Sequence, residues 1–167
     1  MNAEQLCAAQ APLKALYKEK PDTALRTLHA SGRISDSDQT VRIETGHGKV
    51  LAGLHPATGG TGEDACSGDM LLESLAACAG VTFQAVATAL GIAVRNARVL
   101  VEGDLDFRGT LGVAKDVPVG FTAIRLRFEF DSEASAEQRE TLLKLVERYC
   151  VIAQTLRHPP ALDVSLG

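Results

Sequence analysis

The sequence predicts an α+β protein in which a largely antiparallel sheet is wrapped around one long apolar helix. Residues 67–92 read SGDMLLESLAACAGVTFQAVATALGI, and Glu73 is the only formally charged side chain between Met70 and Leu90. Residues 124–131 alternate apolar and charged side chains, which is the period of a half-buried antiparallel strand. Strands and helices do not alternate strictly along the chain, so the pattern favours α+β over α/β.

The segment 67–92 carries signals for both ends of a helix. Ser67 and Asp69 favour a helix start, and Gly91 suits a left-handed cap just beyond the end. A helix that is apolar nearly all round must be covered by other elements, so we expect it to be central and buried. The segment is also long enough to cross a bilayer. Polar residues spread along it, with no basic flank or aromatic belt, favour the core of a soluble protein.

The chain before this helix predicts helical and then extended structure. Residues 3–30 favour helix in two pieces, because Pro12 and Pro21 interrupt a pattern of Ala, Leu and Lys. Residues 40–54 alternate as a hairpin that turns at 46–48. The glycine-rich segment 55–66 lacks a phosphate-binding signature and is predicted to be an ordinary loop.

The chain after this helix predicts two strands, two helices and a last strand. The strands cover roughly residues 95–107 and 124–131. Ser135 and Gln138 form a capping box for a helix that ends near Cys150. A short helix over 152–156 is stopped by two prolines, and residues 161–166 alternate as a closing strand.

Composition excludes several classes of protein. The length of 167 residues suits one domain, and the net charge of -4 gives no basic surface for nucleic acid or for an acidic membrane. The N-terminus shows no secretory signal, so we expect a cytoplasmic protein whose four cysteines are not structural disulfides. There is no C-x-x-C, and the four histidines share no spacing, so neither a thioredoxin-type site nor a metal site is predicted.

Two of the cysteines have distinctive surroundings. Cys78 lies in SLAACAGVT, among small residues that let another segment come close to the sulfur, and Cys150 lies in ERYCVIAQTL at a helix end. Cys7 and Cys66 have less suggestive surroundings and are predicted to be non-catalytic. A buried cysteine is often only a small hydrophobic side chain, so a purely structural Cys78 is the alternative.

The segments GDMLLESLAACAGVT and YCVIAQTL, with a predicted strand pair between them, resemble the OsmC family, the osmotically inducible and organic hydroperoxide resistance proteins. The resemblance covers about residues 40–166. Residues 1–35 then look like a helical N-terminal extension of an OsmC-like domain formed by residues 36–167. The resemblance implies an intertwined homodimer with active sites at the subunit interface. It also implies a thiol peroxidase without bound metal or cofactor, reduced by a dithiol such as a protein-bound dihydrolipoyl group.

By this resemblance Cys78 would attack the peroxide as a thiolate, and Cys150 would resolve the resulting sulfenic acid to a disulfide. Physical chemistry adds a requirement, because an apolar setting raises a thiol pKa. Cys78 also lies about nine residues inside its helix, beyond the first turn where the helix dipole acts. We therefore expect a cationic group at the Cys78 sulfur.

The resemblance also suggests which cation this is. In the family an arginine from the N-terminal β region is held by a carboxylate near the start of the central helix. Arg42 is the first candidate, with Arg33 behind it. Asp69 is the better placed carboxylate, and Glu73, one turn later, is the alternative.

Two departures from the family pattern indicate a divergent branch. Ser67 stands where a proline commonly precedes the acidic position, and Val151 stands where a proline often follows the second cysteine. The sequence thus predicts a two-cysteine peroxidase for organic, fatty-acid-like hydroperoxides, with an apolar pocket around Cys78. The alternative function is a dimeric module that binds an apolar small molecule and has lost the chemistry.

Overall fold

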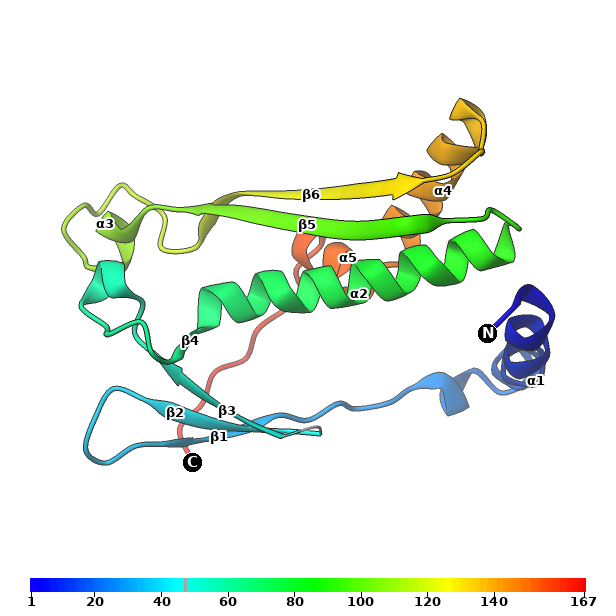
Figure 1. Cartoon of the computed structure of the whole chain (residues 1–167). Coiled ribbons are helices and arrows are strands. Elements are labelled where there is room, and N and C mark those ends of the chain that lie inside the picture. Colours follow the sequence, from blue (N-terminus) through cyan, green and yellow to red (C-terminus); the bar gives the residue numbers. More distant parts are fainter. Residues whose placement is uncertain (47) are drawn as a thin grey trace. The chain divides into compact units, whose positions relative to one another are not determined.

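The computed structural model describes residues 1–46 and 48–167. The helices are α1 (Ala3–Glu19), α2 (Ser67–Ala89), α3 (Phe107–Thr110), α4 (Ala136–Tyr149) and α5 (Val151–Arg157). The strands are β1 (Ser31–Ile34), β2 (Val41–Thr45), β3 (Gly48–Gly53), β4 (Ala65–Cys66), β5 (Arg95–Leu105) and β6 (Phe121–Asp131) (Figure 1). Two short 3-10 turns are η1 (Pro21–Ala24) and η2 (Pro56–Thr58). The predicted α+β class is confirmed.

The chain divides into two units. The first unit contains Met1–Leu16, Ser74–Leu100 and Leu126–Gly167, and the second contains Tyr17–Glu73 and Val101–Arg125. The elements α2, β5 and β6 continue from one unit into the other.

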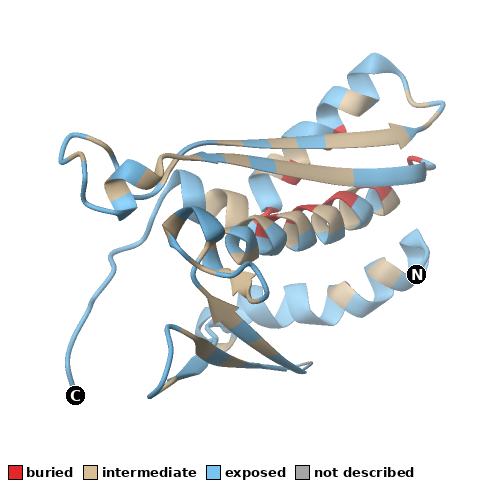
Figure 2. Cartoon of the chain, turned by 60° about the vertical axis from the view of Figure 1, so that its left-hand side comes forward, coloured by how far each residue is buried: buried red, intermediate tan, exposed pale blue. Residues whose placement is uncertain are grey.

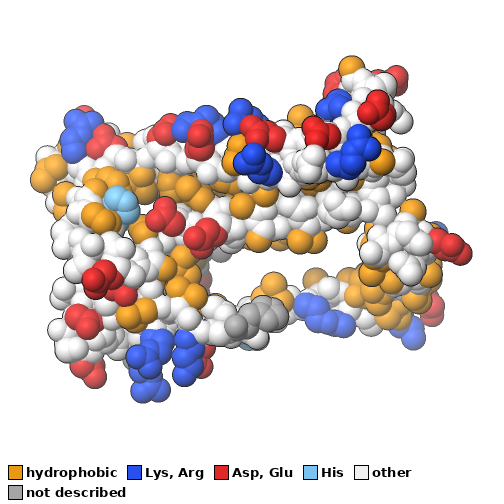
Figure 3. Space-filling model, viewed as in Figure 1, with side chains coloured by type: hydrophobic (Ala, Val, Ile, Leu, Met, Phe, Trp, Pro, Cys, Tyr) orange, Lys and Arg blue, Asp and Glu red, His pale blue; other side chains and the backbone are white. Residues whose placement is uncertain are grey.

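The strands form two sheets that are largely antiparallel, as predicted. In the four-stranded sheet the order is β1-β2-β3-β4, with β1, β2 and β3 antiparallel and β3 parallel to β4. The second sheet is the β5-β6 pair. Basic and acidic side chains lie side by side along this sheet (Figure 3). They form ion pairs such as Arg125 with Glu102 at 3.2 Å and Arg127 with Glu129 at 2.8 Å. The predicted alternation of β6 therefore places charges outward.

The end of α2 follows the predicted signal. Gly91 has a φ of 66°, the left-handed conformation that glycine adopts without strain. The Ile92 amide donates to the Ala87 carbonyl at 2.9 Å, and the Gly91 amide donates to the Thr88 carbonyl at 3.2 Å. These two bonds are the Schellman arrangement that satisfies the last carbonyls of a helix.

Burial along α2 is narrower than predicted. Its buried residues are Leu75, Ala79, Phe83 and Ala87, which are spaced by four and form one stripe (Figure 2). Val81, on another face, is 73% exposed. By length and composition α2 could cross a membrane, but a core helix of a soluble protein meets the same criteria. Within the described residues, the fully buried positions of α2 therefore lie along one face.

The core of the first unit joins α2 to α4 and to the β5-β6 sheet. Phe83 stacks on Phe128 with ring centroids 4.8 Å apart and meets Phe130 edge-on at 5.1 Å. Leu142 and Val146 of α4 are buried against the same cluster. This packing fixes α4, and therefore the position where α4 ends.

The helix α4 begins at the predicted capping box. The Gln138 amide donates to the Ser135 hydroxyl at 3.2 Å, and the Ser135 amide donates to the Gln138 side chain at 2.9 Å. The following short helix is also present, and it runs from Val151 to Arg157.

Several sequence predictions are wrong in detail. Residues 161–166 form no strand, because alternation alone does not supply a neighbouring strand; Leu162, Val164 and Leu166 are exposed. The first helix continues through Pro12, since helix-favouring residues lie on both sides of it. The predicted loop contains η2 and β4, and β1 was not predicted. The turn predicted at 46–48 includes residue 47, which lies outside the described residues.

The predicted boundary at residue 35 lies between β1 and β2. β1, at Ser31–Ile34, pairs with β2 across that boundary, with Arg33 opposite Arg42. The assignment of residues 1–35 as an extension stays a prediction.

Candidate active site

Cys78 lies in the middle of α2, in the first unit. The two residues on either side of it are small (Ala76, Ala77, Ala79 and Gly80), and Ala79 is fully buried. The Cys78 side chain itself is half-buried. The Thr82 hydroxyl, one turn later, donates to the Cys78 carbonyl at 2.8 Å. The thiol is therefore held on a rigid helix while keeping some access to solvent.

Cys150 lies at the junction of α4 and α5 and has no exposed surface. Its amide donates to the Val146 carbonyl, and its carbonyl accepts from the Gln154 amide, both at 2.9 Å. Its own backbone is extended, with φ −74° and ψ 107°. Cys150 therefore ends one helix and begins the next, and the packing of both helices fixes its side chain.

The fold brings the two thiols together, since the side chains of Cys78 and Cys150 interact and shift each other's pKa. Burial raises the pKa of Cys78, but hydrogen-bond donors outweigh burial and the net pKa is lowered. In falling order of effect these donors are the Ile152 amide, the Cys150 thiol, the Val151 amide and the Thr82 hydroxyl. The first amides of α5 thus face the Cys78 sulfur.

The pKa of Cys150 moves in the opposite direction. Burial raises it, and the neighbouring Cys78 raises it further, while the amides of Ala153 and Ile152 offset part of the rise. Of the two thiols, Cys78 therefore ionises first, and Cys150 remains the protonated donor beside it.

The role of the α5 amides was not predicted from the sequence, which favoured a cation at the Cys78 sulfur. All the donors that lower the pKa of Cys78 are uncharged groups. The signal for them was present, because a new helix starting directly after Cys150 leaves its first amides without helical partners. The expectation of a cationic group at the Cys78 sulfur stays a prediction beside these donors.

The predicted ionic partners belong to the second unit. Arg42 of β2 is exposed opposite Arg33, and both line an open groove of about 550 Å³ with Lys49 and Glu44. Asp69 and Glu73, in the first two turns of α2, are exposed. Their roles at Cys78, which belongs to the first unit, stay predictions.

The remaining cysteines are separate from this pair. Cys7 is exposed and Cys66 is half-buried, and all four cysteines are free thiols. Among residues 1–46 and 48–167, no group of three or more His, Cys, Asp or Glu side chains could hold a metal ion.

Comparison with known proteins gives the family. A family model described as OsmC-like protein matches residues 60–165, which include both Cys78 and Cys150. The chain belongs to the OsmC-like family. No curated protein matches this OsmC-like protein.

Solved structures agree with this assignment at the level of the fold. An OsmC-like protein from Mycoplasma pneumoniae is 19% identical with a TM-score of 0.66, over 80% of this chain and 89% of that one. An organic hydroperoxide resistance protein OsmC from Legionella pneumophila is 17% identical with a TM-score of 0.61, over 80% and 93%. An organic hydroperoxide resistance protein from Elizabethkingia anophelis is 12% identical with a TM-score of 0.59, over 81% and 93%.

The lowered pKa of Cys78 predicts that this thiol stays reactive at a lower pH than an ordinary thiol does. Thiolates are the species that iodoacetamide alkylates, so Cys78 should keep its rate to a lower pH than N-acetylcysteine does. Peptide mass spectrometry separates Cys78 from the other thiols. The Cys150→Ala variant removes one donor and should move the Cys78 midpoint upward, while the α5 amides remain. A wild-type midpoint at or above that of N-acetylcysteine would contradict this arrangement.

Proposed function

We propose that this OsmC-like protein is a cysteine-based peroxidase that reduces organic hydroperoxides through Cys78 and Cys150. The observation that carries the proposal is the interaction of a thiol of lowered pKa with a buried second thiol. Perturbed titration of a group next to a reactive partner is a common property of catalytic sites. The fold shared with proteins named for organic hydroperoxide resistance supports the choice of substrate.

Cys78, Cys150 and an external dithiol are sufficient for a complete catalytic cycle. The Cys78 thiolate attacks the terminal oxygen of the hydroperoxide, so an S–O bond forms, the O–O bond breaks, and the alkoxide leaves as alcohol after taking a proton. Cys78 is thereby oxidised to sulfenic acid. The Cys150 sulfur then attacks the Cys78 sulfur, releasing water and forming a disulfide. A dithiol such as a dihydrolipoyl group reduces that disulfide and becomes a cyclic disulfide itself.

The first test is turnover by the intact protein. With cumene hydroperoxide and dihydrolipoamide, the wild type should consume peroxide continuously and form one lipoamide disulfide for each peroxide. If the wild type shows no turnover and Cys78 is unreactive, the alternative of a dimeric binding module for an apolar small molecule is favoured instead.

Cys150 is expected to form a disulfide with Cys78 when hydroperoxide oxidises the protein. With one equivalent of hydroperoxide and no reductant, the wild type should lose both thiols together and form a Cys78–Cys150 disulfide. The Cys150→Ser variant should stop at sulfenic acid on Cys78, because the second sulfur is missing, and overoxidise in excess peroxide. Mass spectrometry follows both outcomes. If the wild type forms no such linkage and overoxidises as fast as the variant, then Cys150 is only structural.

We further infer that the protein is a homodimer. The apolar helix α2 leaves Val81 73% exposed in one chain, and a second copy would cover this position. A charge placed there should weaken the dimer, so Val81→Asp is expected to shift light scattering toward the monomer mass at micromolar concentration. Thr141→Asp, an exposed position on α4, supplies the same charge as a control. A wild type that is a stable, folded monomer would contradict the inference.

A further inference from the structure

The second unit contains a cavity of about 420 Å³ whose lining includes neither Cys78 nor Cys150. This volume lies within the range of small-molecule sites, about 300–1,000 Å³. Its apolar wall is formed by residues from several elements, chiefly Leu54, Leu72, Leu105, Phe107, Val119 and Phe121. A few polar groups complete the lining, among them His55, Cys66 and Asp69. An apolar cavity with a few polar groups is the usual form of a ligand site.

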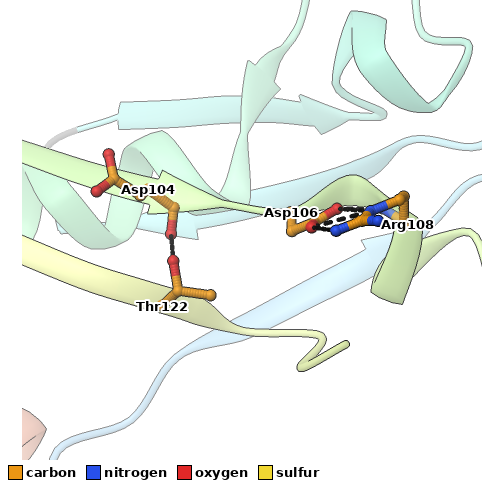
Figure 4. Close-up of polar contacts among 4 residues, drawn as sticks. All are labelled: Asp104, Asp106, Arg108 and Thr122. Atoms are coloured by element: carbon orange, nitrogen blue, oxygen red, sulfur yellow. Dashed lines mark hydrogen bonds and ion pairs between the residues drawn. The ribbon is translucent and has the colours of Figure 1, made fainter. Parts of the chain in front are cut away.

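The aromatic walls of this cavity are fixed before any ligand arrives. The Phe107 ring stacks on His55 with centroids 4.7 Å apart and planes inclined by 17°. Next to Phe107, the Asp106 carboxylate accepts from the Arg108 amide and from its guanidinium Nε, both at 3.0 Å (Figure 4). These hydrogen bonds, chiefly those from the Arg108 side chain, lower the pKa of Asp106 to about 2. The Asp106–Arg108 ion pair therefore persists at any physiological pH.

The second aromatic wall depends on a glycine and on a cross-strand contact. A Cβ at Gly103 would lie 2.6 Å from the Phe121 ring, so the absence of a side chain there lets the ring lie against β5. Beside Phe121, the Thr122 hydroxyl donates to the Asp104 carbonyl at 3.1 Å and ties β6 to β5 (Figure 4). The cavity is therefore preformed, which reduces the entropy lost on binding.

The polar groups restrict the kind of molecule that fits. The His55 Nδ1 accepts a hydrogen bond from the Ala57 amide at 3.0 Å, so a neutral His55 carries its proton on Nε2 and can donate it to a ligand. No Lys or Arg is among the described residues that line the cavity, and Asp69 adds a negative charge. An anionic ligand would therefore be repelled, whereas an uncharged hydrogen-bond acceptor has a donor available.

We propose that this cavity binds an uncharged, mainly aromatic molecule whose carbonyl or hydroxyl oxygen accepts a hydrogen bond from Nε2 of His55, beside the Cys66 thiol. The molecule lies between Phe107 and Phe121. The site is independent of Cys78, so its test does not depend on the protein being a peroxidase.

Cys66 supplies the readout in the full-length wild type. Peptide mass spectrometry measures its alkylation by iodoacetamide with and without 4-phenyl-2-butanone, a neutral aromatic ketone. The ketone should slow alkylation of Cys66 several-fold and leave exposed Cys7 unchanged. 3-Phenylpropionate, which has a similar skeleton and a carboxylate, should protect Cys66 far less. Equal protection by both probes, or protection by neither, would overturn the proposal.

Two matched variants place the probe in the cavity. Gly68→Ala puts a methyl group 3.5 Å from the Phe121 ring and 3.7 Å from the Cys66 sulfur, so it fills the cavity without a clash. Gly80→Ala makes the same change on the same helix, 3.5 Å from Val99 and outside the cavity. The ketone should protect Cys66 less in Gly68→Ala than in Gly80→Ala. Equal protection in the two variants would overturn the placement.

A third variant tests the hydrogen bond. His55→Phe keeps an aromatic ring against Phe107 and removes the Nε2 donor. The ketone should then protect Cys66 no better than butylbenzene, which has no acceptor, whereas in the wild type the ketone should protect better. A preference for the ketone that survives in His55→Phe would overturn the role of His55.

Discussion

Replacing Cys78 by serine is expected to reduce hydroperoxide consumption to the uncatalysed background. A serine hydroxyl does not ionise at neutral pH and cannot take the oxygen atom as a sulfenic acid, so the first step is lost. The measurement is peroxide remaining with time, in the presence of excess dihydrolipoamide.

The control for this experiment is Cys7→Ser, which removes an exposed thiol and should keep wild-type turnover. Circular dichroism should show both variants folded, because serine and cysteine differ little in size. Turnover in Cys78→Ser close to that of the wild type would place the chemistry at another residue and remove the basis of the proposed mechanism.

Truncating Leu142 is expected to destabilise the protein strongly. Its side chain is 1% exposed and belongs to the cluster that joins α4 to α2, so Leu142→Ala is expected to lower the free energy of unfolding by about 2–5 kcal/mol. Urea unfolding followed by far-UV circular dichroism is suitable, because the chain has no tryptophan.

The adjacent residue provides a matched control. Leu143 is 48% exposed, and Leu143→Ala should cost much less because it leaves no buried void. Both variants must be compared at one protein concentration, since dimerisation would add to the apparent stability. Equal losses in the two variants would mean that α4 does not pack as described.

Elements with strong local signals were predicted well from the sequence. The end of α2 depends on one glycine, and the start of α4 on the capping pair of Ser135 and Gln138, so neither needs distant contacts. In β6, apolar and charged side chains alternate along the sequence, so the pattern shows directly which side chains share a face. Local chemistry decides each of these features.

Elements that depend on partners were predicted poorly. β1 has four residues and exists because it pairs with β2, whereas residues 161–166 have the right alternation and no partner strand within the described structure. Burial of α2 was overestimated for a related reason, because the sequence shows which faces are apolar but not which faces are covered in one chain.

The candidate site could be predicted from the sequence only through its resemblance to the OsmC family. Cys78 and Cys150 are far apart in the chain, and no local spacing predicts that their sulfurs interact. The donors around Cys78 come from the junction of α4 and α5, which depends on how both helices pack. Individual residues could be proposed from the sequence, but their arrangement could not.

The uncharged nature of the donors at Cys78 affects how the site responds to its ionic surroundings. Dissolved salt screens interactions between charges over a distance of about 8 Å at physiological ionic strength. Amide and thiol dipoles that contact the sulfur directly are little affected by such screening. A thiolate stabilised in this way should therefore stay reactive from dilute to concentrated salt. A thiolate that depended on an exposed arginine would lose part of its activation as salt is added.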